Sequence, residues 1–363
     1  MLDEIIHLDA ETLENFMKDV FIALGAPEEE ATIIADVLIT SDLRGIESHG
    51  CQRLKMYYDR IKAGDIQPGT KIRIVKETET TARLDAGKGM GHVAAYRGME
   101  IAIDKAKKYG TGAVSVGNSS HFGIAGYYPL MAIKEDMIGL AITNARPSIA
   151  PTFSTENMMG TNPLTIGIPT DEPFPFLIDC ATSITQRGKI EVLARTNKPV
   201  PAGWVINENG KLSTDSNQIL KDLVKGTAAL LPLGGFGEDM GGHKGYGYAA
   251  AVEILSAALW GGPYMKELNT PEALSQLGHF CIAINVESFI GTSTFKKIAG
   301  EICRSLRNSK KAPSHDRIYT AGEKEYEMEQ KRRREGIPIS ASIQQDIKVM
   351  QKDLGLTAYS FQF

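Results

Sequence analysis

Cysteine is scarce in this chain, and the few cysteines present form no pairing pattern. Four occur among 363 residues, with no CxxC pair and no spacing typical of metal ligands: Cys51, Cys180, Cys281 and Cys303. This argues against a disulfide framework and favours a reducing, cytoplasmic compartment. The first residues also lack a basic region followed by an apolar run, so no signal peptide is predicted.

The chain also lacks an excess of positive charge and a long hydrophobic run. The formal net charge is −4, which argues against nucleic acid or an anionic membrane as the main partner. The most apolar stretch, residues 248–265, contains Glu253 and a Gly-Gly-Pro break at 261–263. We therefore expect a buried helix there and no membrane span. A hydrophobic content of 42% is ordinary for a globular protein, and the length suggests two domains.

Several familiar catalytic motifs are missing. The run Gly87–His92 follows a strand-like segment, yet histidine stands where GxGxxG needs its last glycine. A flexible turn into a helix is the favoured interpretation, so a Rossmann domain is not predicted. HExxH and a third metal ligand at suitable spacing are absent, which argues against zinc or another metal. No GxSxG elbow supports serine hydrolase chemistry.

Helical patterns occupy both ends of the chain. Apolar residues recur on one helical face at Leu13, Phe16, Met17, Val20, Phe21 and Leu24. Asp9 is a plausible N-cap, and Gly25 ends this helix before a second one through Ile33 and Leu38. Near the other end, residues 323–335 are strongly charged, and Ser340 begins a helix that closes at Gly355.

The centre of the chain has the pattern of a mixed α/β domain. Segments 72–75 and 80–84 alternate like a hairpin, and residues 93–109 form a helix. Further strands are predicted at 113–116, 138–143, 164–168 and 176–179. Because they are short and separated by polar loops, we expect a mixed, largely antiparallel sheet. The predicted division is a helical domain of residues 1–75 with 300–363 around a central domain of residues 76–299.

Two segments share the same chemical ingredients. Ser48-His49-Gly50, flanked by Arg44, Arg53 and Tyr57, places an imidazole beside a hydroxyl and two guanidiniums. The run Asn118–Gly123 repeats serine, histidine and glycine around His121. A single histidine is more often structural, but two in this setting favour transfer of a proton on a small carboxylate substrate.

Three other stretches have the character of ligand-binding loops. Gly241–Gly247 gathers glycines around His243 and Lys244 just before a helix expected from about Gly247. It suits a phosphate, although a disordered glycine loop is the alternative. The strand 176–179 ends in Asp179, which either binds a ribose hydroxyl or caps the following helix. The turn at Gly160–Leu164 holds Asn162 before a proline, which restricts its backbone.

As a set, these motifs resemble the malate/L-lactate dehydrogenase family, which includes sulfolactate, ureidoglycolate and diketogulonate oxidoreductases and cyclic imino-acid reductases. They occur in family order along nearly the whole chain, and the insertion Gly235–Gly242 is most similar to the malate dehydrogenase branch. The resemblance implies a non-Rossmann nicotinamide-binding α/β fold. It also implies a homodimer with active sites near the interface and NAD or NADP as the cofactor.

The resemblance also assigns roles to particular residues. His49 is the expected proton donor and acceptor with Ser48 beside it, and His121 is the rival for that role. Substrate-binding positions are Arg53, Tyr57, Arg44, Thr161 and Asn162. Cofactor-binding positions are Ser148, Ile178, Asp179, Cys180, Ala181, Thr182, Ser183, His243, Lys244, Ala321, Gly322 and Glu323.

The expected reaction is reversible hydride transfer between malate and oxaloacetate. His49 would take the hydroxyl proton, and Arg53 would hold the C1 carboxylate. A second carboxylate needs a second cation, for which Arg44 and Lys244 are the candidates. Lactate or sulfolactate dehydrogenation, or cyclic imino-acid reduction, is the alternative within the family. A nucleotide-binding protein without catalysis is the alternative outside it, and it would leave both serine–histidine segments unexplained.

Overall fold

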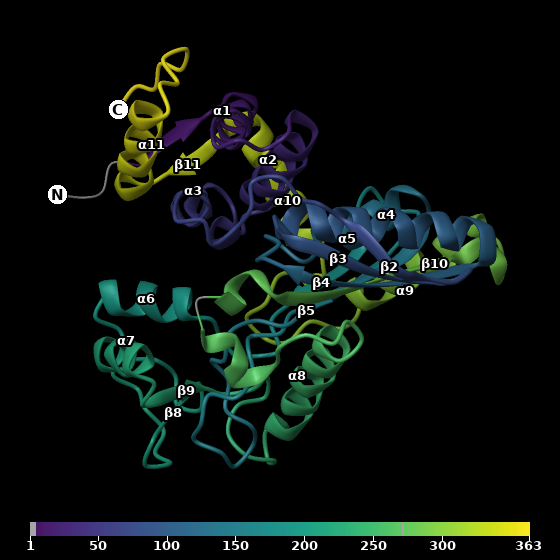
Figure 1. Cartoon of the computed structure of the whole chain (residues 1–363). Helices are drawn as coiled ribbons and strands as arrows, with labels where there is room; N and C mark the ends of the chain where they lie inside the picture. Colours follow the sequence, from purple (N-terminus) through teal and green to yellow (C-terminus); the bar gives the residue numbers. More distant parts are fainter. Residues whose placement is uncertain (1–4, 271) are drawn as a thin grey trace.

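The computed structural model describes residues 5–270 and 272–363, and a seven-stranded sheet forms its centre (Figure 1). The strand order is β2-β3-β4-β10-β5-β6-β7. Only β3 and β4 pair in parallel, and the other five neighbouring pairs in this sheet are antiparallel. The strands are β2 (Arg73–Glu77), β3 (Thr81–Gly89), β4 (Thr111–Ser119), β5 (Met137–Thr143), β6 (Leu164–Ile168), β7 (Phe176–Cys180) and β10 (Leu277–Asn285). The expectation of a mixed, largely antiparallel sheet is confirmed.

Helix α4 (Gly91–Tyr109) connects the parallel pair and packs closely on the sheet. Small residues make this approach possible. A Cβ on Gly98 would lie 2.7 Å from the Val116 side chain, and one on Gly112 would lie 2.1 Å from the Ala102 carbonyl oxygen. Helix α5 (Tyr127–Lys134) packs on β5 and β6. The tight packing fixes the ends of β4 and β5, where several predicted site residues follow.

The two ends of the chain meet in one helical cluster (Figure 1, purple and yellow). Strand β1 (Ile6–Leu8) pairs antiparallel with β11 (Ile337–Ile339). The helices of this cluster are α1 (Ala10–Ala23), α2 (Glu28–Leu43), α3 (Leu54–Lys62), α10 (Glu323–Glu335) and α11 (Ala341–Asp353). Asp9 caps α1 as predicted, since its carboxylate accepts the Thr12 N–H at 2.9 Å. The predicted apolar face of α1 is fully buried from Leu13 to Phe21.

The division into domains stays a prediction, and its second boundary meets a continuous helix. Helix α9 (Thr292–Arg307) crosses residue 300. Two of its basic side chains pair with acidic residues of the central part of the chain, Lys296 with Asp136 and Arg304 with Asp171.

A small lobe below the sheet was not predicted from the sequence (Figure 1). It combines α6 (Arg187–Arg195), β8 (Val205–Asn207), α7 (Ser216–Lys225) and β9 (Ala228–Leu230). Its buried side chains form a core of their own: Ile190, Val200, Val205, Ile219, Ala228 and Leu230. The remaining short 3₁₀ turns are η1 (Glu47–His49), η2 (Cys51–Arg53), η3 (Met265–Asn269), η4 (Glu272–Ser275) and η5 (Val286–Ser288).

Helix α8 (Gly242–Ala257) corrects two expectations. It begins five residues before Gly247, because Gly241 adopts a left-handed conformation (φ 85°) that lets the chain enter the helix earlier. It is also not a buried helix, since Tyr248 is 55% exposed and Ile254 62% exposed. Only one side of α8 packs on the sheet. In the part of the chain that the structure covers, no helix has the length and apolarity needed to cross a membrane.

Candidate active site

The segment around His49 is a pair of 3₁₀ turns, η1 and η2, between α2 and α3. Asp42, near the end of α2, is almost fully buried, and its carboxylate accepts the Cys51 N–H at 2.7 Å. A Cβ on Gly50 would lie 2.0 Å from the Asp42 Oδ1 atom, so glycine is required there. Arg332 from α10 donates to the Asp42 carbonyl and to Glu47. These contacts fix the backbone on both sides of His49.

Ser48 and Arg53 hold the His49 side chain and its turn. The Ser48 hydroxyl lies 2.9 Å from His49 Nδ1, and Arg53 Nε donates to the Ser48 carbonyl at 2.7 Å. Burial, with the Arg53 charge as a smaller cause, lowers the pKa of His49 to about 4. His49 is therefore neutral at pH 7, and the terminal nitrogens of Arg53 make no hydrogen bond or ion pair among the described residues.

The loop that carries His121 is fixed by its neighbours in the sequence. Ser119 Oγ lies 2.8 Å from His279 Nε2, and Ser120 Oγ accepts the Gly91 N–H at 2.9 Å. Both serines are fully buried. They anchor the end of β4 to β10 and to the start of α4, and leave His121 at the loop's partly exposed position.

The fold brings the two predicted histidines together. The His49 and His121 rings stack with their centroids 5.5 Å apart. The Tyr57 hydroxyl, one helical turn after Arg53 on α3, lies 2.6 Å from His121 Nδ1. Burial lowers the pKa of His121 well below its usual value, and the charge of His49 acts in the same direction. Both imidazoles thus belong to a single site.

The hydrogen bonds assign the tautomer of His121. The Gly123 N–H donates to His121 Nδ1 at 3.4 Å, so that nitrogen is an acceptor. Burial raises the pKa of Tyr57 above its usual value, so its hydroxyl stays protonated and donates to the same atom. Neutral His121 therefore carries its proton on Nε2. His49 has no such constraint, because the Ser48 hydroxyl either donates or accepts.

His92 is a member of this site that the sequence analysis treated only as part of a turn. Its ring is fully buried and meets the Tyr57 ring edge-on at 4.8 Å. Burial lowers the pKa of His92 to about 3, so it is neutral. Gly123 lies against it, since a Cβ there would come within 3.2 Å of the imidazole. A histidine in the first turn of a helix gave no signal that it would pack behind Tyr57.

A cavity of about 330 Å³ lies beside the outer strand of the sheet. Its lining includes the predicted cofactor positions Ile178, Asp179, Cys180, Ala321 and Gly322, together with Arg44, Lys324 and Glu325. The Leu177 N–H donates to the Ala321 carbonyl at 3.1 Å, which joins the 319–322 turn to β7. The volume of this cavity lies in the range of small-ligand sites.

Asp179 lines the cavity and does not cap the helix that follows it, because α6 has no side-chain cap. Its carboxylate accepts the Gly126 N–H at the start of α5 at 2.8 Å. Burial raises its pKa to about 6 despite this bond and the Arg44 charge. Arg44 itself is buried and forms an ion pair of 3.5 Å with Glu329.

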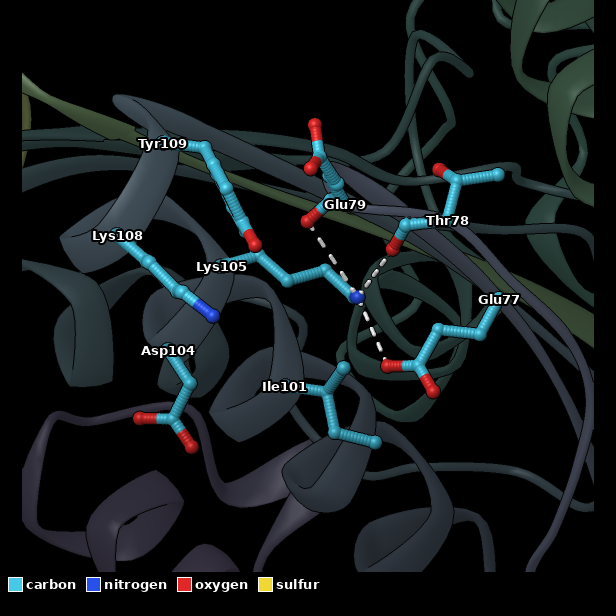
Figure 2. A pocket seen from close by; sticks show the side chains of 8 residues that line it. All are labelled: Glu77, Thr78, Glu79, Ile101, Asp104, Lys105, Lys108 and Tyr109. Carbon is cyan, nitrogen blue, oxygen red and sulfur yellow. Dashed lines mark hydrogen bonds and ion pairs between the residues drawn. The ribbon is translucent and has the colours of Figure 1, made fainter.

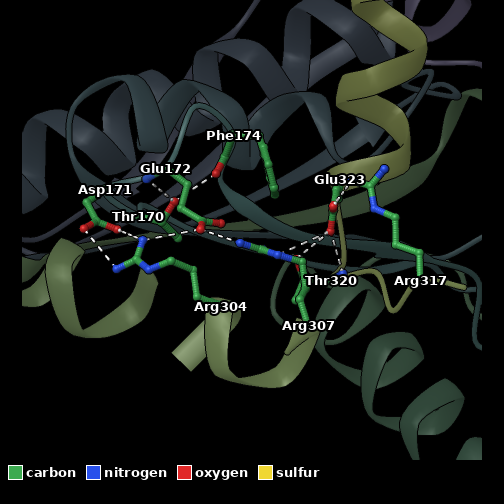
Figure 3. A network of polar contacts seen from close by, with 9 residues as sticks. All are labelled: Thr170, Asp171, Glu172, Phe174, Arg304, Arg307, Arg317, Thr320 and Glu323. Carbon is green, nitrogen blue, oxygen red and sulfur yellow. Dashed lines mark hydrogen bonds and ion pairs between the residues drawn. The ribbon is translucent and has the colours of Figure 1, made fainter. Parts of the chain in front are cut away.

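Glu323 does not line this cavity and belongs to a network of ion pairs (Figure 3). Its carboxylate accepts from the Thr320 N–H at 3.0 Å and pairs with Arg317, while Arg307 pairs with Glu172. The network ties α9, the loop before β7 and the first turn of α10 together. Glu323 therefore supports the turn that lines the cavity, and its carboxylate is already engaged.

Other predicted positions make structural contacts. Asn162 is fully buried, and its amide donates to Glu253 at 2.8 Å and to the Ala249 carbonyl at 3.0 Å on α8. The Thr182 hydroxyl donates to the Thr161 carbonyl, and the Ser183 hydroxyl donates to that of Thr185. These bonds hold the loops around β7 in place.

The glycine–lysine loop is attached to the same region. The Leu233 N–H donates to the Thr182 carbonyl at 2.8 Å, and a Cβ on Gly245 would lie 2.1 Å from the Leu233 carbonyl oxygen. The first turn of α8 therefore packs on the loop that follows β7. His243 and Lys244 are exposed on that turn, while Ser148 Oγ is buried with no partner among the described residues.

A second cavity, of about 460 Å³, contains none of the predicted residues (Figure 2). It lies between the β2–β3 turn and the last turns of α4. Lys105 reaches into it and pairs with Glu77 at 2.8 Å, and it also donates to the Thr78 carbonyl at 2.6 Å. These contacts satisfy the Lys105 ammonium group, which therefore links α4 to the β2–β3 turn.

Comparison with known proteins identifies the family of this chain. A family model described as malate/L-lactate dehydrogenase matches residues 8–348. The chain belongs to this family. A malate dehydrogenase of Pyrococcus abyssi is 43% identical over 98% of this chain and 96% of its own. An L-sulfolactate dehydrogenase of Methanocaldococcus jannaschii is 38% identical over 96% of this chain and 97% of its own.

A solved structure extends the likeness to the fold. The crystal structure of malate dehydrogenase from Entamoeba histolytica aligns with a TM-score of 0.95 and 46% identity, covering 99% of this chain and 100% of that one. The non-Rossmann α/β fold expected from the family resemblance is thus confirmed. As a malate/L-lactate dehydrogenase family member, the chain is an NAD(P)-dependent oxidoreductase that acts on the CH–OH group of 2-hydroxy acids.

Proposed function

We propose that this family member is a malate dehydrogenase, which interconverts malate and oxaloacetate with NAD or NADP. The observation that carries the proposal is the stacked pair of His49 and His121, with the free guanidinium end of Arg53 on the same site. The high identity to malate dehydrogenases over the full length supports the choice of substrate.

The two histidines have complementary roles in this proposal. With Ser48 accepting from His49 Nδ1, the Nε2 lone pair of His49 takes the proton of the substrate hydroxyl during oxidation. His121 presents its Nε2–H and donates to the same substrate oxygen, which stabilises charge on that oxygen as the C–H bond breaks. In reduction His49 returns the proton. The neutral tautomer of His121 has no acceptor nitrogen left for the proton.

Arg53 and Tyr57 orient the substrate. The Nε atom of Arg53 is used on the Ser48 carbonyl, and its two terminal nitrogens remain for bidentate pairing with the C1 carboxylate. Because the same arginine holds the turn of His49, the carboxylate and the base are placed by one side chain. Tyr57 contributes indirectly by fixing the His121 ring.

The residues around β7 and α8 fit a nicotinamide dinucleotide. The cavity between β7 and the 319–322 turn suits one part of it, with Asp179 facing ribose hydroxyls. Lys244 on the exposed first turn of α8 suits the phosphates, and the buried Ser148 hydroxyl offers an unused donor and acceptor. When bound, the cofactor supplies the carbon that accepts or gives the hydride.

The functional unit in this proposal is a homodimer. Large apolar side chains are exposed along α8 and the loops on either side of it: Leu233, Phe236, Met240, Tyr246, Tyr248, Ile254, Leu255, Leu259 and Tyr264. Exposure of this many large apolar side chains on one helix and its neighbouring loops is typical of a protein interface. Since Lys244 lies on the same helix, the interface adjoins the cofactor site.

A substrate screen tests the proposal. Oxidation of NADH and of NADPH is followed with oxaloacetate, sulfopyruvate, pyruvate and piperideine-2-carboxylate at one pH. We expect kcat/KM to be highest with oxaloacetate. A preference of tenfold or more for sulfopyruvate, pyruvate or the cyclic imine would replace malate with that substrate's reduced form. Binding of the cofactor without turnover on any of them would contradict an enzymatic role.

A further inference from the structure

Helix α3 presents three functional side chains on one face. Arg53 stands at its N-cap, Tyr57 four residues later and Arg60 seven residues later, which is the spacing of a single helical stripe. Tyr57 reaches His121 with its hydroxyl. Arg60 therefore lies one turn beyond Tyr57 on the side of the helix that faces the two histidines.

A third arginine, on another element, interacts electrostatically with Arg60. Arg146 follows β5, in a loop anchored by Asn144, whose backbone N–H donates to Gly278 and whose side chain accepts from it. After burial, the Arg146 charge is the largest cause that lowers the pKa of Arg60, and the Arg53 charge adds to it. Arg53 and Arg60 also lower the pKa of His121. Arg53 and Arg60 thus act on His121, and Arg146 acts on Arg60 from the next element.

No acidic side chain neutralises this cluster within the part of the chain that the structure describes. The side chains of Arg60 and Arg146 form no ion pair or hydrogen bond there, and Arg53 donates only to a carbonyl. Asp65 is exposed and raises the pKa of Arg60, but it does not come within ion-pair distance. Three unpaired cations repel one another, so the site is suited to an anion that carries more than one charge.

We propose that Arg60, assisted by Arg146, binds the second acidic group of a doubly charged substrate, while Arg53 binds the C1 carboxylate. The inference rests on the proposed function and names the residue that separates diacids from lactate or pyruvate. Two cations were predicted from the sequence for this role. Arg44 lines the cavity beside β7, where it pairs with Glu329, and Lys244 is exposed on α8. The second acidic group is a carboxylate in malate and a sulfonate in sulfolactate.

Substitution of Arg60 tests this assignment. For Arg60→Gln we expect the ratio of kcat/KM for oxaloacetate to that for pyruvate to fall about 100-fold, mainly through KM for oxaloacetate. Arg60→Lys should recover part of that loss, and Arg146→Gln should give a smaller loss of the same kind. If sulfopyruvate is the better substrate, its ratio to pyruvate falls in the same way. If pyruvate turnover is too slow, inhibition by the monoanion oxamate supplies the comparison.

Two matched variants complete the experiment. Lys55→Gln removes a cation from the same helix, where it pairs with Asp59, and should leave the ratio unchanged. Arg53→Gln should lower kcat/KM for diacid and monoacid together. An equal loss on both substrates in Arg60→Gln, or no loss, would overturn the inference. An unmodified enzyme that reduces neither oxaloacetate nor sulfopyruvate would instead overturn the proposed function.

Discussion

At the scale of single residues, the two active-site histidines differ through the atoms that contact Nδ1. His121 Nδ1 receives hydrogen bonds from Tyr57 and Gly123, whereas His49 Nδ1 meets only the adaptable Ser48 hydroxyl. In the proposed mechanism this difference makes one ring of the stacked pair the base and the other a hydrogen-bond donor.

Replacing His49 with alanine tests this separation. His49→Ala should lower kcat roughly 100-fold or more in both directions, because no group remains to take the proton. Cofactor affinity should stay within a few-fold. Added imidazole should restore part of the activity, as measured from rates against imidazole concentration. His121→Gln keeps a side-chain N–H and should retain more activity than His121→Ala, without rescue by imidazole. Rescue of His121→Ala alone would exchange the two roles.

Gly50 is another residue that cannot be changed freely, because a neighbouring carboxylate leaves no room for a side chain. In Gly50→Ala the new methyl would meet the buried Asp42 carboxylate, so the turn that carries His49 has to shift. We expect unfolding free energy to fall by about 1–3 kcal/mol and kcat to fall at least tenfold. Denaturant unfolding and steady-state rates measure the two effects. Gly188→Ala is the matched control, since nothing lies within 4 Å of a Cβ there. An unchanged kcat in Gly50→Ala would show that the turn tolerates the methyl.

At the scale of elements, the network in Figure 3 holds the turn that lines the cavity proposed for the cofactor. Arg307 on α9 pairs with the buried carboxylate of Glu172 and approaches that of Glu323. Arg307→Gln should cost about 2 kcal/mol of stability, because Glu172 and Glu323 keep only their other arginines. It should also raise the Kd of NAD(P)H several-fold with kcat preserved. Fluorescence titration and thermal unfolding measure these changes.

The neighbouring Arg304 supplies the comparison for that network. Its guanidinium is more exposed and pairs mainly with exposed Asp171, so Arg304→Gln should change cofactor binding little. If both substitutions changed the Kd of the cofactor equally, the Arg307 contacts would not be what holds the turn beside the cavity.

Elements with a long, regular pattern were predictable. The charged helix was predicted at residues 323–335 and the strand at 164–168, and both have those bounds, because caps and alternation mark them locally. The lobe of residues 187–230 was missed because its strands are only three residues long. Partners such as Arg307 and Glu172 are far apart in the chain, and local pattern carries no information about them.

The same distinction applies to the site. His49, Ser48, Arg53 and His121 were predicted from motifs and family resemblance, and the structure brings them together. His92 and Asp42 were not predicted, since their importance depends on what the fold packs against them. Arg60 was visible only as a helical spacing from Arg53, and nothing in the sequence orients that stripe toward His121.

At the scale of the whole molecule, buried neutral histidines make stability depend on pH. The pKa values of His49, His92 and His279 fall to about 4, 3 and 3, and that of His121 also falls. Between about pH 4 and 6.5 the unfolded chain binds protons at these four groups that the folded chain does not. Stability should therefore decrease as the pH falls through this window.

Two carboxyls oppose this trend in part. Burial raises the pKa of Asp42 to about 7 and that of Asp179 to about 6, so the folded protein holds protons there that the unfolded chain releases. Near pH 5, unfolding takes up about four protons at the histidines and releases about two from the carboxyls. The net uptake is therefore about two protons. Denaturant unfolding from pH 7 to 5, with potentiometric measurement of proton uptake, checks both statements. Greater stability at pH 5 than at pH 7 would contradict them.

The pairing of β1 with β11 also determines when during synthesis the enzyme is completed. Ile6 lies opposite Ile339, and α10 supports the turn of His49 through Arg332. While a ribosome is still making the chain, α1, α2 and α3 have emerged without the strand and helices that complete their core. The turn of His49 is therefore completed only after α10 and β11 have left the exit tunnel, so a product truncated before α10 would lack the contacts that hold this turn.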